Sequence, residues 1–323
     1  MKNIELPRFA CTILALALAA SVAPGARAQA PTTDIWIVPL DLTTSPPALG
    51  EPRNVTDRQG YDNQPFFAPE GKSLLYTSQH GEQTDIYKLD LTTFVSTQLT
   101  ETDESEYSAT VVPSGLEFSV IRVESDGTQR LWSFRRDGSS PQLVLENVAP
   151  VGYQAWNANE ALVMFVLGEP ATLQLADLES DAATVVATDI GRSLHALPDE
   201  SGGFSFLHRM DGNWRIRSFE PTSGEIGELG TPFEASQDMA WTPDGRIIMG
   251  SESRVAIRTV DGSWREIGDL AAAGVAGITR VAVHPDGDRI AIVGQREFSW
   301  RALERAARSP SPRDASAAIR VNR

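Results

Sequence analysis

The chain has 323 residues, with 43 acidic side chains against 28 basic ones and a formal net charge of −15. Such an acidic protein repels phosphate groups, which excludes nucleic acids and anionic membrane surfaces as partners. The single cysteine, Cys11, lies near the start of the chain, so the rest of the sequence must be held together by its hydrophobic core rather than by disulfides.

Residues 1–30 have the pattern of a cleaved secretory signal peptide. Lys2 and Arg8 precede an apolar stretch over residues 9–22, and small residues in an Ala-x-Ala spacing end at residue 28 or 30. The stretch is too short for a membrane anchor, and no later apolar run reaches the roughly 18 residues that a spanning helix needs. We therefore expect a periplasmic or secreted protein without membrane insertion.

A β-strand followed by a tight turn, often Pro-Asp-Gly, recurs every 40–45 residues from residue 64 onward. Proline fixes φ and glycine tolerates positive φ, so these residues favour a reversal of the chain. Further short strands follow each turn, and helical periodicity is almost absent. Four antiparallel strands per repeat of this length predict an all-β fold, a six-bladed β-propeller. The residues that precede or open the turns are Pro69, Pro113, Ala158, Pro198, Pro243 and Pro285.

The sixth repeat has only two strands, over residues 278–295. The missing pair is found near the other end of the chain, because residues 34–42 and 52–57 resemble the third and fourth strands of a blade. N-terminal strands that pair with C-terminal strands would close the ring and remove its exposed sheet edges. The sequence thus predicts a propeller over residues 31–295 with one shared blade.

The last segment, residues 296–323, is basic and contains Ser-Pro-Ser-Pro at 309–312. It shows no strand-like alternation, so we expect a disordered tail. Docking of this basic segment on the acidic ring is the alternative.

Several segments resemble one known family. The stretch Ala-Pro-Glu-Gly-Lys-Ser-Leu-Leu-Tyr-Thr-Ser at 68–78, Thr-Asp-Ile-Tyr-Lys-Leu-Asp-Leu at 84–91, and the later Thr-Pro-Asp-Gly and His-Pro-Asp-Gly turns are similar to the WD40-like repeats of TolB-type periplasmic proteins. The resemblance covers residues 34–295 and implies an exported propeller. It does not imply one activity, because the repeat occurs in binding proteins and as a gating domain of prolyl-oligopeptidase-type peptidases.

The first strand of each propeller blade lines the central channel, so the segments that lead into these strands converge at the channel mouth. A concave mouth with convergent polar groups is the expected ligand site. The polar, aromatic and charged candidates for this site are Asp62, Asn63, Glu106, Tyr107, Tyr153, Arg192, His195, Asp238 and Arg280.

The mixture of charges at the mouth favours a partner that carries a carboxylate, such as a peptide segment or a chain terminus. Arg192 and Arg280 can each pair with a carboxylate through two hydrogen bonds. One alternative is a structural ion network among these arginines and the acids, with His195 as an ordinary core side chain. Another is a divalent metal ion, Ca²⁺ or similar, held by hard oxygen ligands. The oxygen ligands in that case would be Asp62, Asn63, Glu106 and Asp238.

Motifs for nucleophilic serine, zinc-protease, phosphate-loop and dinucleotide chemistry are missing from the sequence. We therefore expect a binding module rather than an enzyme, with no cofactor. The expected partner is a protein or peptide of the cell envelope, bound by a monomer. Two alternatives stay open. One is a metal-dependent hydrolase of the lactonase or esterase kind, and the other is a carbohydrate or small-molecule binder that uses Tyr107, Tyr153 and Trp156 as stacking surfaces.

Overall fold

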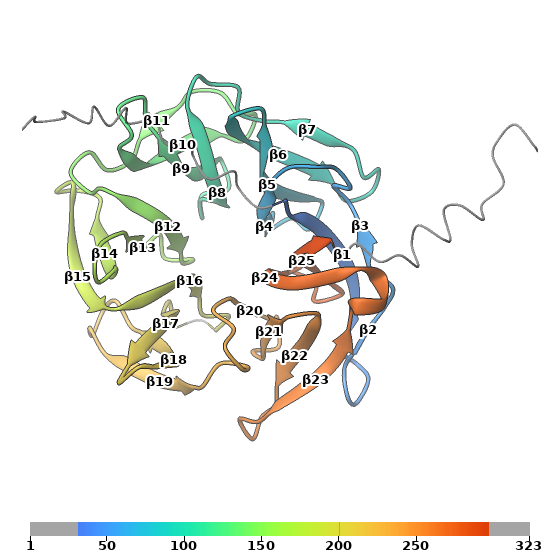
Figure 1. The fold of residues 1–323 in the computed structure, drawn as a ribbon. Helices are drawn as coiled ribbons and strands as arrows, with labels where there is room; N and C mark the ends of the chain where they lie inside the picture. The colour runs from blue at the N-terminus through green and yellow to red at the C-terminus, as the bar shows by residue number, and fades with distance from the viewer. Residues whose placement is uncertain (1–31, 200, 297–323) are drawn as a thin grey trace, which may run out of the picture. The chain divides into compact units, whose positions relative to one another are not determined.

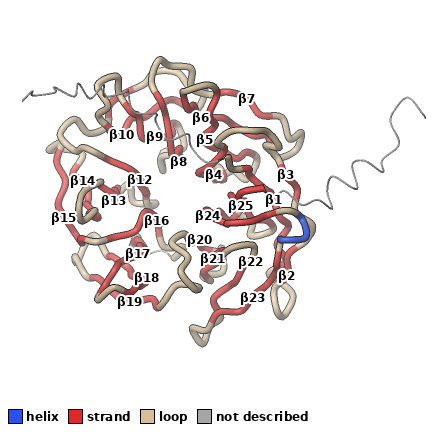
Figure 2. The backbone as a smooth tube through the Cα atoms, in the orientation of Figure 1, coloured by secondary structure: helices blue, strands red, loops and turns tan. Residues whose placement is uncertain are grey.

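A computed structural model describes residues 32–199 and 201–296. Antiparallel sheets are arranged in a ring around a central channel, as Figures 1 and 2 show. The prediction of an all-β propeller with six four-stranded blades is confirmed. The predicted signal peptide and nearly all of the predicted tail lie outside the described residues. The described part of the chain contains no helix long and apolar enough to cross a membrane.

Each blade runs from an inner strand at the channel to an outer strand at the rim. Blade 1 consists of β4 (Asp62–Phe67), β5 (Ser73–His80), β6 (Gln83–Asp90) and β7 (Ser96–Gln98). Blade 2 consists of β8 (Ser105–Val111), β9 (Glu117–Val123), β10 (Gln129–Arg135) and β11 (Gln142–Leu143). Blade 3 consists of β12 (Val151–Trp156), β13 (Leu162–Val166), β14 (Thr172–Asp177) and β15 (Ala182–Thr188).

The second half of the ring follows the same order. Blade 4 consists of β16 (Ile190–Ala196), β17 (Phe204–Met210), β18 (Asn213–Phe219) and β19 (Ile226–Gly230). Blade 5 consists of β20 (Met239–Trp241), β21 (Ile247–Ser251), β22 (Arg254–Arg258) and β23 (Trp264–Asp269). Blade 6 consists of β24 (Val275–Val283), β25 (Arg289–Arg296), β1 (Asp34–Asp41), and an outer position shared by β2 (Ala48–Leu49) and β3 (Arg53–Asn54).

The hydrophobic core lies between the blades rather than in one central mass. Each of six clusters of buried side chains is shared by two neighbouring blades. Trp156 and Trp241 add a polar contact to this packing, because their indole N–H groups donate to Ser119 Oγ and Ser205 Oγ of the preceding blade, at 2.9 and 2.8 Å. Both tryptophans therefore join adjacent blades.

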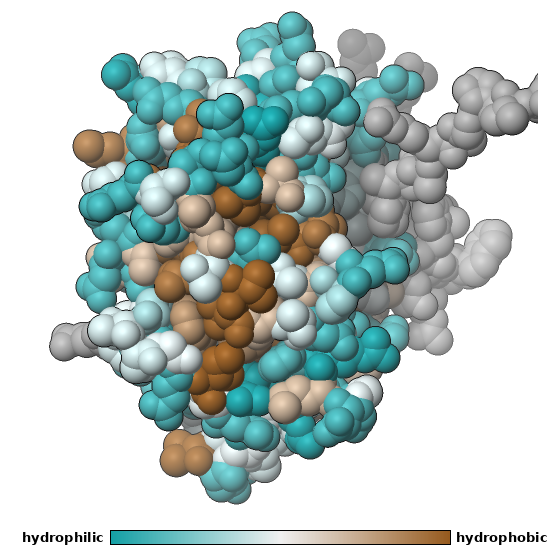
Figure 3. Space-filling model, turned by 90° about the vertical axis from the view of Figure 1, so that its left-hand side faces the viewer, coloured by the Kyte–Doolittle hydropathy of each residue, from teal (hydrophilic) through white to brown (hydrophobic). Residues whose placement is uncertain are grey.

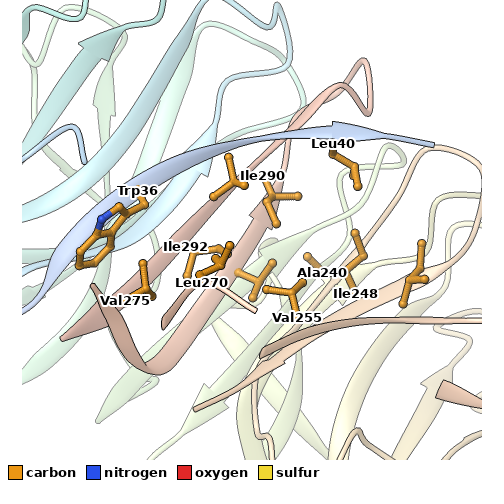
Figure 4. Close-up of a cluster of buried hydrophobic side chains, with 12 residues drawn as sticks. Trp36, Leu40, Ala240, Ile248, Val255, Leu270, Val275, Ile290 and Ile292 are labelled. Carbon is orange, nitrogen blue, oxygen red and sulfur yellow. The ribbon is translucent and has the colours of Figure 1, made fainter. Parts of the chain in front are cut away.

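Blade 6 closes the ring as predicted. β1 pairs antiparallel with β25 from Asp34 opposite Gly294 to Pro39 opposite Arg289. The buried Asp34 carboxylate accepts hydrogen bonds from Arg296 at 3.0 and 2.7 Å, so the described end of the sheet is held by an ion pair. Figure 4 shows the cluster between blades 5 and 6, where Trp36 of β1 packs with residues from β20 to β25.

We predict that Trp36→Ala lowers the free energy of unfolding by about 3–5 kcal/mol, because it leaves a large cavity at the closing blade. Trp36 is 3% exposed. Urea denaturation followed by circular dichroism measures the effect. Val260→Ala is the control, since this side chain is fully exposed and should change stability by less than about 0.5 kcal/mol. Equal midpoints for the two variants would show that the closing cluster does not limit stability.

We also predict a pH effect at the buried Asp85 of β6. Burial raises the pKa of this carboxyl to about 6, and the nearby Glu101 adds to the shift. Between about pH 4 and pH 6 the folded chain keeps a proton that the unfolded chain has released, so this group's contribution to stability falls as pH rises through that window. Asp85→Asn should remove that part of the pH dependence and gain stability relative to the native protein above pH 6. If the free energies of unfolding of the two proteins changed with pH in the same way between pH 4 and 7.5, the raised pKa of Asp85 would be contradicted.

Candidate functional site

The inner strands of all six blades surround a channel cavity of about 390 Å³. Arg192, near the start of β16, and Asp238, directly before β20, line one end of the cavity, and Arg280 of β24 lies beside Asp238. Trp156 and Trp241 line it where β12 and β20 end. The cavity therefore has a charged mouth and a more aromatic floor.

Irregularities in the inner strands shape this channel. The register between β4 and β5 shifts after Asn63, and that between β8 and β9 shifts after Tyr107. Gln64 and Ser108 occupy these two bulges with φ of 55° and 56°, a left-handed conformation that is uncommon for residues other than glycine. A bulge bends the strand and redirects its side chains.

Polar side chains tie neighbouring inner strands together across the channel wall. Gln64 Oε1 accepts from the backbone N–H of Ser108 at 3.0 Å, and Gln154 Nε2 donates to the Ser108 carbonyl at 2.8 Å. Further round the ring, Ser193 Oγ accepts from the N–H of Met239 at 3.1 Å. The wall of the channel is thus held by hydrogen bonds from one blade to the next.

Asp238 and Arg280 form the central ion pair of the mouth. Arg280 Nη1 lies 3.2 Å from Asp238 Oδ2, and Asp238 Oδ1 accepts from the N–H of Val281 at 3.0 Å. Arg280 Nη2 donates to the Tyr153 hydroxyl at 2.9 Å, although Tyr153 lies on the other side of the ring in blade 3. The pKa of Arg280 is raised: burial acts to lower it, but Asp238 and the tyrosines outweigh that effect.

Arg192 adds a second cation beside this pair. Its Nη2 donates to the carbonyl oxygen of Thr279 at 3.1 Å, and Arg280 Nη1 donates to the same oxygen at 3.2 Å. Two guanidinium groups therefore meet at one carbonyl. Among the described residues no carboxylate lies within ion-pair distance of Arg192, and its Nε is buried without a hydrogen-bond partner. Burial, and then the charge of Arg280, lower the pKa of Arg192.

Tyrosine side chains surround the two arginines. Burial raises the pKa of Tyr61, and the neighbouring groups that act on it include Tyr153, Arg280, Tyr107 and Arg192. Tyr61 was not among the sequence candidates, although it precedes Asp62 directly. Its position two residues before Asn63, in a strand-like segment, was the available signal.

Asp62 and Glu106 do not join this cluster. Both are fully buried and paired with an arginine. Arg58, in the segment that leads into β4, pairs with Asp62 at 2.7 Å, and Arg122 of β9 pairs with Glu106 at 3.0 Å. Burial is the main cause that raises the pKa of both carboxyls. Asn63 Oδ1 accepts from the backbone N–H of Gln64 at 2.8 Å, so this side chain supports the local chain path.

His195 faces the channel but is tied to its own strand. Its Nε2 lies 3.0 Å from Ser193 Oγ, the same oxygen that accepts the Met239 N–H. Burial lowers the pKa of His195, which favours a neutral ring whose Nε2 can accept a hydrogen bond from the Ser193 hydroxyl. This contact serves the junction between blades 4 and 5.

A second cavity of about 320 Å³ opens between blades 5 and 6, and Arg192 and Asp238 line both cavities. Glu252 and Thr279 also line this second cavity. In the part of the chain that the structure describes, no group of three or more His, Cys, Asp or Glu side chains is placed to hold a metal ion.

Comparison with known proteins places this architecture among TolB-like propellers. No family model matches the chain, and no curated protein matches it in sequence. A candidate TolB from Agrobacterium tumefaciens has a TM-score of 0.64 at 17% identity, covering 83% of this chain and 99% of its own. TolB from Acinetobacter baumannii has a TM-score of 0.56 at 13% identity, with 82% of this chain and 64% of that chain covered.

The same architecture also occurs in an enzyme. An oligogalacturonate lyase from Vibrio parahaemolyticus has a TM-score of 0.51 at 13% identity and covers 81% of this chain and 97% of its own. At these identities the comparisons define the fold alone, and the fold is compatible with binding or with catalysis. The chain has the fold of a six-bladed β-propeller, and this fold is similar to that of the TolB structures.

Proposed function

We propose that the protein is a binding module that takes up a carboxylate group of a protein or peptide partner at the channel mouth. The observation that carries the proposal is the charge balance there. Two guanidinium groups, Arg192 and Arg280, donate to the carbonyl of Thr279, but among the described residues only Asp238 forms an ion pair there, and it does so with Arg280 alone. The mouth is therefore locally cationic in a protein whose net charge is −15.

A carboxylate suits this mouth better than other anions or a metal cation. Arginine presents a planar fork of N–H groups that matches the two oxygens of a carboxylate. Within residues 32–199 and 201–296 the Arg192 Nε is buried without a hydrogen-bond partner, so a ligand oxygen beside it would satisfy this donor. The Tyr153 hydroxyl, already a partner of Arg280, offers a further polar group to the ligand.

The cavity behind the mouth can hold more than the carboxylate. Its volume of about 390 Å³ is in the range of small-molecule and side-chain pockets. Trp156 and Trp241 at the far end offer apolar surface to a side chain next to the carboxylate. We infer that the ligand is a peptide segment or chain terminus rather than a small inorganic anion. The signal-like residues 1–30 support a partner in the cell envelope.

The expected effect of Arg192→Gln is a loss of at least tenfold in affinity for acetylated tripeptides with a free terminal carboxylate, since one hydrogen bond to a charged group contributes about 1.5–3 kcal/mol. Isothermal titration calorimetry measures these affinities for a small panel of tripeptides. Peptides of the same sequence that end in a carboxamide serve as the comparison. The melting temperature should stay close to that of the native protein, because Arg192 contacts the fold through a single carbonyl.

Arg289→Gln is the matched control for this experiment. Arg289 pairs with Asp288 at the start of β25, opposite Pro39 of β1, and does not line the channel. The Arg289→Gln variant should bind the tripeptides with the affinity of the native protein. Equal binding of acid and carboxamide peptides, or unfolding of Arg192→Gln, would refute the proposed role of the mouth.

A further inference from the structure

The outer strands of the six blades differ in how well their exposed edges are protected. An outer strand exposes one edge whose backbone groups can pair with another chain, and proteins protect such edges with short strands or charged side chains. β7, β11, β2 and β3 span only two or three residues each. Glu228 lies in β19, and β23 carries Arg265, Glu266 and Asp269.

β15 of blade 3 has neither kind of protection. It is seven residues long, and its sequence Ala-Ala-Thr-Val-Val-Ala-Thr contains no charged residue and no proline. At roughly 3.3 Å per residue it offers an edge of about 23 Å. Its pairing with β14 shifts once, between Leu173 and Gln174, but β19 and β23 carry similar shifts, so this irregularity does not set β15 apart.

Apolar side chains are also exposed around this edge. Val185 in β15 is 53% exposed, and Leu178 in the turn before β15 is 45% exposed. Figure 3 views the ring from the side where β15 lies in Figure 1, and apolar residues gather in the middle of that face. The edge and the exposed side chains together form a surface suited to another strand.

The charges at the ends of β15 indicate which strand fits. Asp177, Glu179 and Asp181 lie at the end where β15 begins, and Asp189 follows its last residue. A second copy paired antiparallel about Val185 would set Asp181 of one chain opposite Asp189 of the other. Like charges directly opposite each other destabilise a sheet, and two chains of charge −15 also repel as a whole.

We infer that β15 binds an extended segment of a partner protein, which adds a fifth strand to blade 3. The segment has an uncharged, β-branched centre and a Lys or Arg at each end. Backbone hydrogen bonds supply affinity in this mode of recognition, and side chains on alternate positions supply specificity. The basic ends pair with the acids that flank β15. This inference is separate from the proposed function of the mouth, because it uses neither Arg192 nor Arg280.

The test uses a fluorescent peptide, acetyl-Lys-Thr-Val-Thr-Val-Thr-Lys-amide, titrated with the native protein and followed by anisotropy at low salt. A twin with Glu at both ends keeps the same centre and should bind at least tenfold more weakly. A twin that is N-methylated at alternate residues cannot donate along one edge and should not bind. Hydrogen exchange should show protection of residues 182–188 on addition of the Lys peptide.

Two protein variants complete the design. Val185→Lys places a cation on the apolar edge and should reduce binding at least tenfold. Val95→Lys is its control, because Val95 is similarly exposed, at 59%, beside the outer strand of blade 1. Both variants should melt near the native temperature, since both side chains face solvent.

Three results would overturn the inference. The first is equal binding of the Lys and Glu peptides. The second is protection that appears away from residues 182–188. The third is a native protein that dimerises in sedimentation velocity while Val185→Lys stays monomeric, because β15 would then pair with a second copy. Arg192→Gln should bind the Lys peptide like the native protein, so failure here and failure of the carboxylate site are distinguishable.

Discussion

The pairing of β1 with β25 is the constraint on which the rest of the structure depends. It joins residues 34–39 to residues 289–294 and makes blade 6 from both ends of the described chain. Each blade shares one hydrophobic cluster with each of its two neighbours, so every blade depends on the ring being closed. Without this pairing the six inner strands would not surround a common channel, and residues such as Tyr153 and Arg280 would not meet.

The channel combines a rigid wall with an uneven charge distribution. Buried acids in the inner strands are paired: Asp62 with Arg58, Glu106 with Arg122, and Asp238 with Arg280. A buried ion needs such a partner, because desolvation of an unpaired charge costs several kcal/mol. Arg192 departs from this rule among the described residues of the mouth, which is why the mouth suits an anionic group.

Departures from the sixfold pattern mark both the channel mouth and the β15 edge. The repeat places equivalent residues at equivalent positions, so most differences between blades are absorbed in packing. Arg192 in β16 adds a charge that the carboxylates around it do not match, and β15 omits the charges or shortness that protect the other outer strands. The first departure lies on the concave mouth and the second on the rim, so the two surfaces can act independently.

Strand periodicity and turn chemistry are local properties of a sequence. For this reason the blade count and the shared blade could be predicted from the spacing of turns, the alternation of apolar residues and the split sixth repeat. The sequence also indicated that the segments leading into the inner strands would converge. It could not indicate which side chains face the channel. Asp62 and Glu106 turn away to Arg58 and Arg122, since the pleat and the bulges after Asn63 and Tyr107 set side-chain direction. Only the closed ring decided that Tyr153, Arg192 and Arg280 lie together, because the Tyr153–Arg280 contact joins residues 127 positions apart and the Arg192–Thr279 contact joins residues 87 positions apart.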